Sequence, residues 1–268
     1  MFNLLNMDLY RVKRSKSVYV CLCIFFAITV LVYWMLWLLA TPGGQEKAVS
    51  IGLILAEERE SAADVLSGVD SLVMFRQICQ DGGMYKVVFG IWVMLFVCSD
   101  FQGGFIKNIM ALHQKRQNYI GSKIITAGIV NFCFLVLNLI FTLMMNRLFG
   151  NMVPYAGWKD LLFYLSWDWL LTTAFGALII LVCILTRSVA AGAAVSVLLG
   201  SGMIVMMLYG TLNVFHMGGW MKYTIYLTGS MGPGRYTSMK DLYVYVVGAG
   251  FLVLYTVAAG IALKRQDI

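Results

Sequence analysis

Six long apolar segments constrain the fold of this chain more than any other feature of its sequence. A helix of about 20 mostly apolar residues crosses the hydrocarbon core of a bilayer. The candidate segments are Val18–Ala40, Val87–Phe105, Ile124–Leu148, Leu161–Leu185, Val189–Leu212 and Leu242–Leu263. The fourth and fifth segments are separated only by Thr186-Arg187-Ser188, which predicts a tight turn. The pattern predicts an all-α integral membrane protein with six transmembrane helices.

The composition agrees with a chain made mainly of membrane helices. Hydrophobic residues make up 60% of the 268 residues and charged residues only 12%, whereas a soluble domain has about 25% charged residues. We therefore expect residues 1–268 to form a single six-span membrane domain. The first apolar run is too long for the core of a signal peptide, so we expect it to be retained as a span. Most of the net charge of +7 lies at span ends, so it does not indicate a nucleic acid partner.

The positions of lysine and arginine predict the orientation in the membrane, because cytoplasmic loops carry an excess of these residues. A cytoplasmic N-terminus places most of the basic residues inside. These residues are Arg11, Lys13, Arg14, Lys16, Lys107, Lys115, Arg116, Lys123, Arg187, Lys264 and Arg265. The acids on the same side are Asp8, Asp267 and the boundary residue Asp100, whereas the first loop on the other side is net acidic. Six spans then put both termini in the cytoplasm.

Residues 1–17, before the first span, are expected to form a helix at the membrane interface. Phe2, Leu5, Leu9 and Val12 recur at helical spacing, a pattern typical of a helix that lies in the headgroup plane. A disordered basic tail that only sets the topology is the alternative.

Two longer segments, residues 41–86 and 213–241, are expected on the extracellular side. The second contains the aromatic and apolar stretch Trp220–Leu227 between two glycine-containing turns. This stretch either dips into the membrane or serves as an interfacial aromatic anchor, and the sequence favours neither.

Motifs for catalysis and metal binding are missing from the sequence. There is no Gly-x-x-x-x-Gly-Lys-Ser/Thr loop, no Gly-x-Ser-x-Gly elbow and no His-Glu-x-x-His helix. The cysteines and histidines lack the spacing of metal ligands, and Cys79 is the single cysteine expected in a polar loop. We therefore expect no catalytic residue, no metal site, no cofactor and no disulfide framework in this chain.

Two carboxylates lie within or near the predicted spans, where a charge is costly unless it is paired or hydrated. Asp100 is near the inner end of the second span, and pairing with Lys107 or another basic residue nearby is favoured over a solvated acid. Asp168 lies in the outer half of the fourth span and Arg147 ends the third span on the same side. A tight hairpin would bring Asp168 and Arg147 together, and a water-filled vestibule is the alternative. We expect these residues to have structural or gating roles.

The fifth predicted span is rich in small residues, which allow helices to approach closely. Gly192, Gly200 and Gly202 are the candidate contacts with a second subunit. Packing within one chain is the alternative and is nearly as well supported.

The segment between the second and third spans carries the most specific pattern. Asp100 is followed by Gly103-Gly104, then by Lys107-Asn108-Ile109, and later by Arg116 and by Lys123, which opens the third span. Residues 107–123 are expected to form a short basic helix on the cytoplasmic side. Together with the N-terminal helix and the six spans, this order resembles permeases of type-2 ATP-binding-cassette (ABC) exporters. It is similar to the subgroup that serves bacitracin and lantibiotic resistance or immunity, and the resemblance covers essentially the whole chain.

The resemblance implies that the chain works with partners that hydrolyse ATP. A second permease subunit, identical or homologous, would pair with it, and cytoplasmic ABC ATPase subunits holding ATP and Mg would dock below. Residues 107–123 would be the coupling helix that receives force from the ATPase. Its expected docking residues are Asn108, Leu112, Lys115, Arg116 and Tyr119. Gly103 and Gly104 would act as part of the gating region at its start.

The function that this resemblance implies is ATP-driven export of amphipathic antimicrobial peptides or other hydrophobic toxins in a bacterial plasma membrane. The scarcity of charges within the spans favours such a substrate over an ion or a sugar. A membrane sensor or scaffold that binds peptide without transport is the alternative. An intramembrane enzyme would need a catalytic pair at depth, and an ion-coupled transporter often has inverted repeats with charged residues at mid-membrane. The sequence offers neither.

Overall fold

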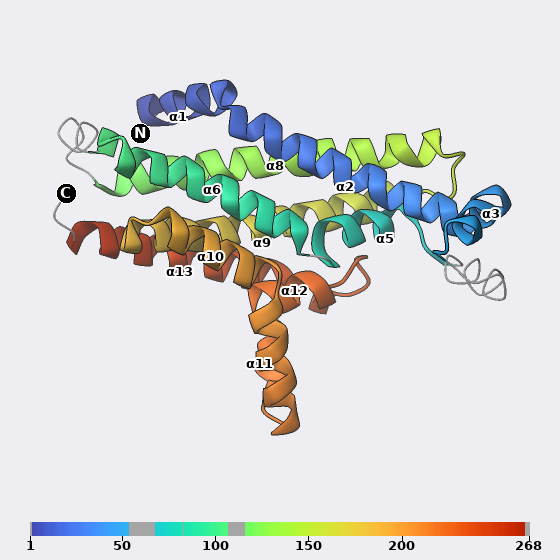
Figure 1. Ribbon diagram of the computed structural model, residues 1–268. Coiled ribbons are helices and arrows are strands. Elements are labelled where there is room, and N and C mark those ends of the chain that lie inside the picture. Colours follow the sequence, from blue (N-terminus) through green and yellow to red (C-terminus); the bar gives the residue numbers. More distant parts are fainter. Residues whose placement is uncertain (1, 54–67, 82, 107–115, 266–268) are drawn as a thin grey trace.

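A computed structural model describes residues 2–53, 68–81, 83–106 and 116–265, and all regular structure in these ranges is helical (Figure 1). The long helices are α2 (Lys16–Ala40), α6 (Met84–Gln102), α8 (Arg116–Leu148), α9 (Trp158–Thr186) and α13 (Tyr243–Arg265). The shorter helices are α1 (Phe2–Arg14), α3 (Pro42–Ser50), α5 (Ser71–Arg76), α10 (Val189–Gly200), α11 (Met203–Val214) and α12 (Ile225–Met231). A π-helix, η2 (Gln77–Asp81), and two 3₁₀ helices, η3 (Gly218–Tyr223) and η4 (Met239–Leu242), complete the described structure.

The protein is a multi-pass membrane protein. The helices α2, α6, α8, α9 and η4 together with α13 are long and apolar enough to cross a bilayer. Each of them overlaps a span expected from the sequence. The remaining expected span, residues 189–212, corresponds to α10 and α11, which pass the same test only as a bent pair. The described residues therefore contain five spanning helices, or six spans if the bent pair is counted as one.

The long helices lie side by side in a bundle whose two ends differ. One end holds α1, the last turns of α13, the end of α6 and the start of α8 (Figure 1). We call this the termini end, and we call the opposite end, which holds α3, the far end. The helix α9 runs through the centre and packs against α6, α8, α10 and α13. Most of its length is buried, with Trp167, Leu171 and Ile179 fully enclosed, as expected for a helix that is apolar on all sides.

The fifth predicted span is not one continuous helix. The chain bends by 49° between α10 and α11, at Gly200-Ser201-Gly202. Gly202 has a φ of +74°, in the left-handed region that glycine adopts readily, and a Cβ at this position would overlap the Tyr226 ring. The span expected at residues 189–212 is thus present as two helices joined by a bend, which the unbroken apolar run did not reveal.

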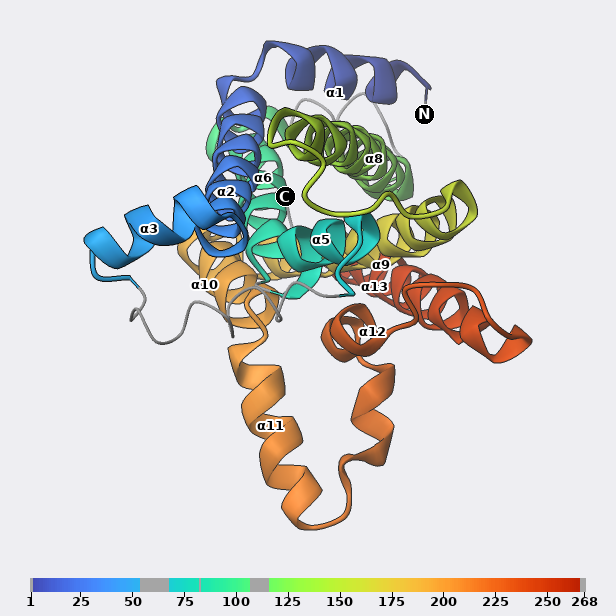
Figure 2. The same cartoon turned by 90° about the vertical axis from the view of Figure 1, so that its right-hand side faces the viewer.

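Because of the bend, α11 projects away from the bundle, and we call this projection the arm (Figure 2). The chain then returns through η3 to α12. None of the α11 residues is buried. The helix α12, by contrast, returns to the bundle and packs on α9, with Leu227 and Thr228 fully enclosed. The aromatic stretch at residues 220–227 thus begins on the arm and ends inside the bundle.

Candidate functional site

The main concentration of buried charge in the described residues lies at the termini end, around Lys123 on α8. Its Nζ atom is 2.7 Å from Asp8 Oδ1 and 2.7 Å from Asp100 Oδ2. Asp8 belongs to α1 and Asp100 to α6, so one ammonium group connects three helices. All three side chains are buried. The Nζ atom also lies 4.0 Å from the centroid of the Phe96 ring, close enough for a cation–π interaction.

Arg11 supplies the second cation of this network. Its guanidinium donates to Asp100 Oδ1 at 2.6 Å and to Ser99 Oγ at 3.3 Å. It also lies 3.9 Å from Asp8 Oδ1 and stacks over the Phe105 ring. Two cations thus balance two carboxylates. Neutrality favours the network because an uncompensated charge in such a place costs several kcal/mol.

Two hydroxyl groups complete the coordination of the carboxylates. Tyr119 donates to Asp100 Oδ2 at 3.0 Å, and Ser122 donates to Asp8 Oδ2 at 2.7 Å. We refer to Asp8, Arg11, Asp100, Tyr119, Ser122 and Lys123 as the termini-end network.

Local sequence explains why these groups meet. On α1, Leu4, Asp8 and Val12 are spaced four residues apart and form the buried face, which packs against α8. Of the residues expected to face the membrane interface, Val12 lies on this buried face and Phe2 is exposed, and their contact with lipid stays a prediction. The expected N-terminal helix itself is present.

Asp100 is placed by the end of α6. The helix stops at Gln102, and Gly104 has a φ of +65°, which lets the chain turn away two residues later. Asp100 is thus fully buried in the last turn of α6 and is paired, as the sequence favoured. Its partners are Lys123 and Arg11. Lys107, the first partner considered, lies outside the described residues.

The predicted coupling helix at residues 107–123 needs correction. Asn108, Leu112 and Lys115 lie outside the described residues. The chain from Arg116 onward is the beginning of α8, which continues without a break to Leu148. Residues 116–123 are therefore the first turns of a spanning helix and not the second half of a separate one.

Tyr119 is likewise not on an exposed docking face. Its side chain is buried and faces α6, where its hydroxyl bonds Asp100. Tyr119 was expected among the docking residues, but its hydrogen bond to the buried carboxylate of Asp100 holds it inside the bundle.

The expected pairing of Asp168 with Arg147 was also wrong. Arg147 is exposed near the end of α8, Asp168 is fully buried, and no ion pair joins them in the part of the chain that the structure describes. Thr172 donates to Asp168 Oδ1 at 3.4 Å, and the charges of Lys86 and Arg76 act on its carboxylate. The hairpin expectation failed because Asp168 is enclosed within the bundle, where the charge of Lys86 acts on it, whereas Arg147 is exposed near the end of α8.

Buried polar groups continue from this region through the centre of the bundle. The Tyr85 hydroxyl lies 2.8 Å from Asn131 Oδ1, and Asn131 Nδ2 donates to Thr173 Oγ1 at 3.1 Å. These bonds join α6, α8 and α9. Satisfied polar contacts of this kind hold membrane helices in register where apolar contacts alone do not.

A second buried group joins α2, α8 and η2. Thr29 donates to Asn138 Oδ1 at 3.0 Å, and Asn138 Nδ2 donates to the Cys79 sulfur at 3.4 Å. Cys79 is therefore buried in a helix and is not in the polar loop that the sequence suggested. All six cysteines are unbridged.

The glycines of the fifth predicted span pack within the chain. A Cβ at Gly192 would press on Met94 of α6, and one at Gly200 would lie 3.0 Å from the backbone nitrogen of Val87. Gly202 forms the bend between α10 and α11 described above. The small size of these residues is explained by contacts inside one chain, and a subunit interface at Gly192, Gly200 and Gly202 stays a prediction.

Sequence reasoning missed Asp8, Arg11 and Lys86 as site residues. Asp8 could have been found as an acid within the otherwise basic segment that precedes the first span. Lys86 was counted with a loop, although α6 begins before it at Met84. Within residues 2–53, 68–81, 83–106 and 116–265, no group of three or more His, Cys, Asp or Glu is arranged to hold a metal ion.

Comparison with protein-family models gives no match to this chain, and none of the curated proteins searched matches it either.

Proposed function

We propose that this chain is the permease subunit of an ATP-driven exporter in a bacterial plasma membrane, with both termini in the cytoplasm. It would pair with a second, identical or homologous permease, and cytoplasmic ABC ATPase subunits would bind and hydrolyse ATP. The exported substrates would be amphipathic antimicrobial peptides or other hydrophobic toxins. The chain itself would contribute no catalytic group.

The observation that carries this proposal is the burial of Lys123 between Asp8 and Asp100. Asp100 lies in the last turn of α6 and Lys123 lies near the start of α8. Their ion pair therefore connects the two helices that flank residues 103–115. A force applied to that segment would reach α6 and α8 together and would also move α1. A permease driven by a separate ATPase needs a rigid connection of this kind.

The distribution of exposed charge supports the proposed orientation. Lys13, Lys16, Lys264 and Arg265 are exposed at the termini end. Away from that end, the exposed basic residues Lys47, Arg147, Lys159 and Lys240 are accompanied by the acids Glu46, Asp160 and Asp241. Arg235 there forms an ion pair with Asp70. An excess of positive charge on one side is typical of the cytoplasmic face.

The experiment that tests the proposal is co-purification in mild detergent after expression with the neighbouring genes, followed by mass spectrometry. We expect a stoichiometric protein with a Gly-x-x-x-x-Gly-Lys-Ser/Thr loop. Arg116→Glu should release this partner, because Arg116 begins α8 at the end of the proposed docking segment. Lys159→Glu is the matched control, since Lys159 is exposed on α9 at the far end and should leave the partner bound.

Purification of the chain alone, under conditions that preserve other ATPase–permease complexes, would contradict the proposal. The peptide sensor or scaffold would then become the leading function. If the partner binds but Arg116→Glu and Lys159→Glu behave alike, the ATPase docks elsewhere and the assignment of the coupling segment is wrong.

A further inference from the structure

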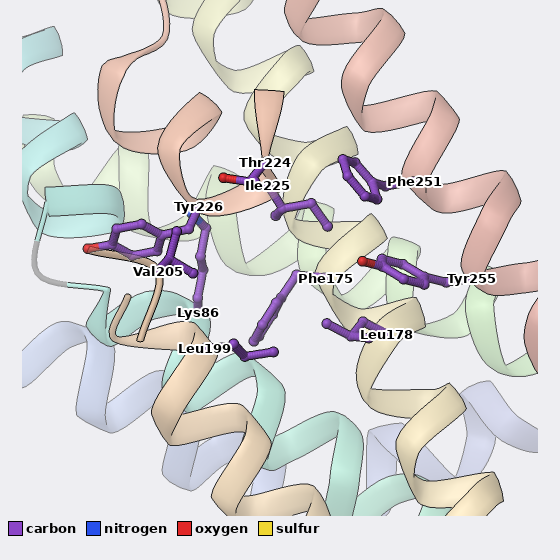
Figure 3. Close-up of a pocket in the computed structure, with 10 residues that line it drawn as sticks. All are labelled: Lys86, Phe175, Leu178, Leu199, Val205, Thr224, Ile225, Tyr226, Phe251 and Tyr255. Carbon is purple, nitrogen blue, oxygen red and sulfur yellow. The ribbon is translucent and has the colours of Figure 1, made fainter. Parts of the chain in front are cut away.

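A pocket of about 180 Å³ opens in the side of the bundle, between α9, α13, α12 and the bend that joins α10 to α11. Phe175 and Leu178 of α9 form its floor, and Phe251 and Tyr255 of α13 form one side (Figure 3). Lys86 of α6 and Tyr226 of α12 lie on the opposite side.

The lining is almost entirely hydrocarbon and aromatic. An apolar cavity of about 150 Å³ stays dry and accepts a ring the size of benzene. A pocket slightly larger than this holds a polar head with the first few carbons of a chain, but not a folded peptide. Leu178, Phe251 and Tyr255 remain partly exposed, so the pocket reaches the surface of the bundle.

That surface is apolar. Leu254, which lies between Phe251 and Tyr255 on α13, is exposed and belongs to a membrane-spanning helix. Because such a surface faces lipid, an occupant would enter from the hydrocarbon phase and could leave a long chain in it.

Lys86 places an ionisable side chain in the otherwise apolar lining of the pocket. Its side chain is only 1% exposed, and its Nζ atom lies 5.1 Å from the centroid of the Tyr226 ring. An ionisable residue inside a membrane protein is costly to place and usually marks a functional site. An ammonium group has three N–H donors, so it can bridge two anions at once.

The charges around Lys86 favour an acidic occupant. Lys86 and Arg76 both act on the carboxylate of Asp168, which is fully buried. Arg76 itself donates to the backbone carbonyls of Ser230 and Gly232. Lys86 therefore adds a positive charge to an otherwise apolar lining, and the low dielectric constant of the surroundings would strengthen its attraction for a carboxylate.

We propose that the pocket binds the acidic head of a single-chain carboxylate amphiphile, such as a fatty acid. The carboxylate lies on the side of the pocket that Lys86 and Tyr226 line, with the Tyr226 ring turned aside to uncover the enclosed ammonium of Lys86. The first carbons of the chain pack on Phe175 and Leu178, and the rest passes Phe251 and Tyr255 into the lipid. This site requires neither an ATPase nor transport, and it stands or falls independently of the function proposed above.

Photolabelling of the full chain in neutral-lipid nanodiscs tests the proposal. The probe is palmitic acid with a diazirine next to its carboxyl group, and mass spectrometry locates the adduct. We expect adducts on the peptides that contain Phe175–Leu178 and Phe251–Tyr255. Unlabelled palmitate should compete at least about tenfold better than hexadecanol, and hexadecylamine should compete worse than hexadecanol. Equal competition by the three compounds, or adducts spread over all lipid-facing helices, would overturn the proposal.

Variants separate the pocket from the general lipid surface. Leu199→Trp places a larger side chain in the lining and should reduce labelling about tenfold, whereas Val253→Trp, on the exposed face of α13, should not. Asp168→Asn keeps the side-chain shape and removes the opposing charge, so it should strengthen competition by palmitate.

The double variant Lys86→Met with Asp168→Asn removes both charges together and so avoids leaving a buried carboxylate alone. It should abolish the preference of the pocket for palmitate over hexadecanol while the chain still folds. Unchanged preference in this variant would show that Lys86 does not bind the head. Labelling abolished by adding phosphatidylglycerol to the nanodiscs would assign the site to phospholipid and contradict the fatty acid assignment.

Discussion

Lys123 Nζ and Asp8 Oδ1 lie 2.7 Å apart although the two residues are separated by 115 positions in the sequence. This ion pair fixes α1 against α8, and the second contact of Lys123, to Asp100, adds α6. A buried ion pair adds little net stability over apolar packing, but the loss of one partner is costly because the other charge stays buried. The network therefore specifies how these three helices meet.

We predict that Lys123→Met strongly destabilises the protein. Methionine fills a similar volume but leaves Arg11 as the only cation paired with Asp8 and Asp100 among the residues that the structure describes, so the cost should be about 3–5 kcal/mol. Thermal or denaturant unfolding of the purified protein in detergent measures it. Lys13→Met is the matched control, because Lys13 is exposed on the same helix as Asp8 and its loss should change stability by less than about 0.5 kcal/mol. Equal effects of the two substitutions would contradict a structural role for the network.

We predict a smaller loss from Tyr119→Phe, which removes only the hydroxyl that donates to Asp100. A hydrogen bond to a charged group contributes about 1.5–3 kcal/mol, and Asp100 keeps Lys123 and Arg11 in this variant. The expected loss is therefore about 1.5 kcal/mol in the same unfolding measurement. Tyr10→Phe, at an exposed position of α1, should have no measurable effect. If Tyr119→Phe is also neutral, the hydroxyl does not contribute to holding α6 against α8.

We predict that the two ends of the bundle lie on opposite sides of the membrane. Three spanning helices, α2, α6 and α8, separate Lys13 from Lys159. In a variant without native cysteines, Lys159→Cys should react with a membrane-impermeant maleimide in intact cells. Lys13→Cys and Lys264→Cys should react only after permeabilisation, because a charged reagent does not cross the hydrocarbon core. Reaction of Lys13→Cys in intact cells would reverse the proposed orientation.

The sequence was sufficient to predict the approximate positions of five spanning helices, whereas the remaining expected span is a bent pair of helices. Apolar runs such as those at 18–40 and 161–185 are long enough that no soluble fold competes with a membrane helix. The same runs say nothing about how the helices pack. Asp8 is paired with Lys123 because α1 lies across α8, and this arrangement depends on contacts between helices and not on the periodicity of either one.

The positions of charges near helix ends were harder to predict, because they depend on where a helix begins. From the sequence we placed Lys86 at the end of a loop. In the structure α6 begins at Met84, so Lys86 belongs to this helix and lies inside the bundle beside Tyr226. Tyr119 was expected in a coupling helix, but it lies on α8 and its side chain is packed in the bundle, where its hydroxyl bonds Asp100. A shift of a few residues in the boundary of α6 thus exchanged a solvent-exposed position for a buried one at Lys86, and a contact between helices did so at Tyr119.

We predict that replacement by alanine lowers the stability of the protein at Gly202, in the bend, and raises it at Gly210, in α11. Gly202→Ala forces a φ of +74° on a residue with a Cβ and drives that Cβ into the Tyr226 ring, which cannot move without disturbing Lys86. Strain of this backbone kind alone costs about 1–3 kcal/mol, and the overlap adds to it. Gly210→Ala, in the exposed helix α11 with open space around its Cβ, should instead stabilise the helix by about 0.5–1 kcal/mol. Unfolding of the two variants in the same detergent measures both effects. A neutral Gly202→Ala would mean that α10 and α11 form a straight helix in the membrane, and the arm in Figure 2 would then not exist there.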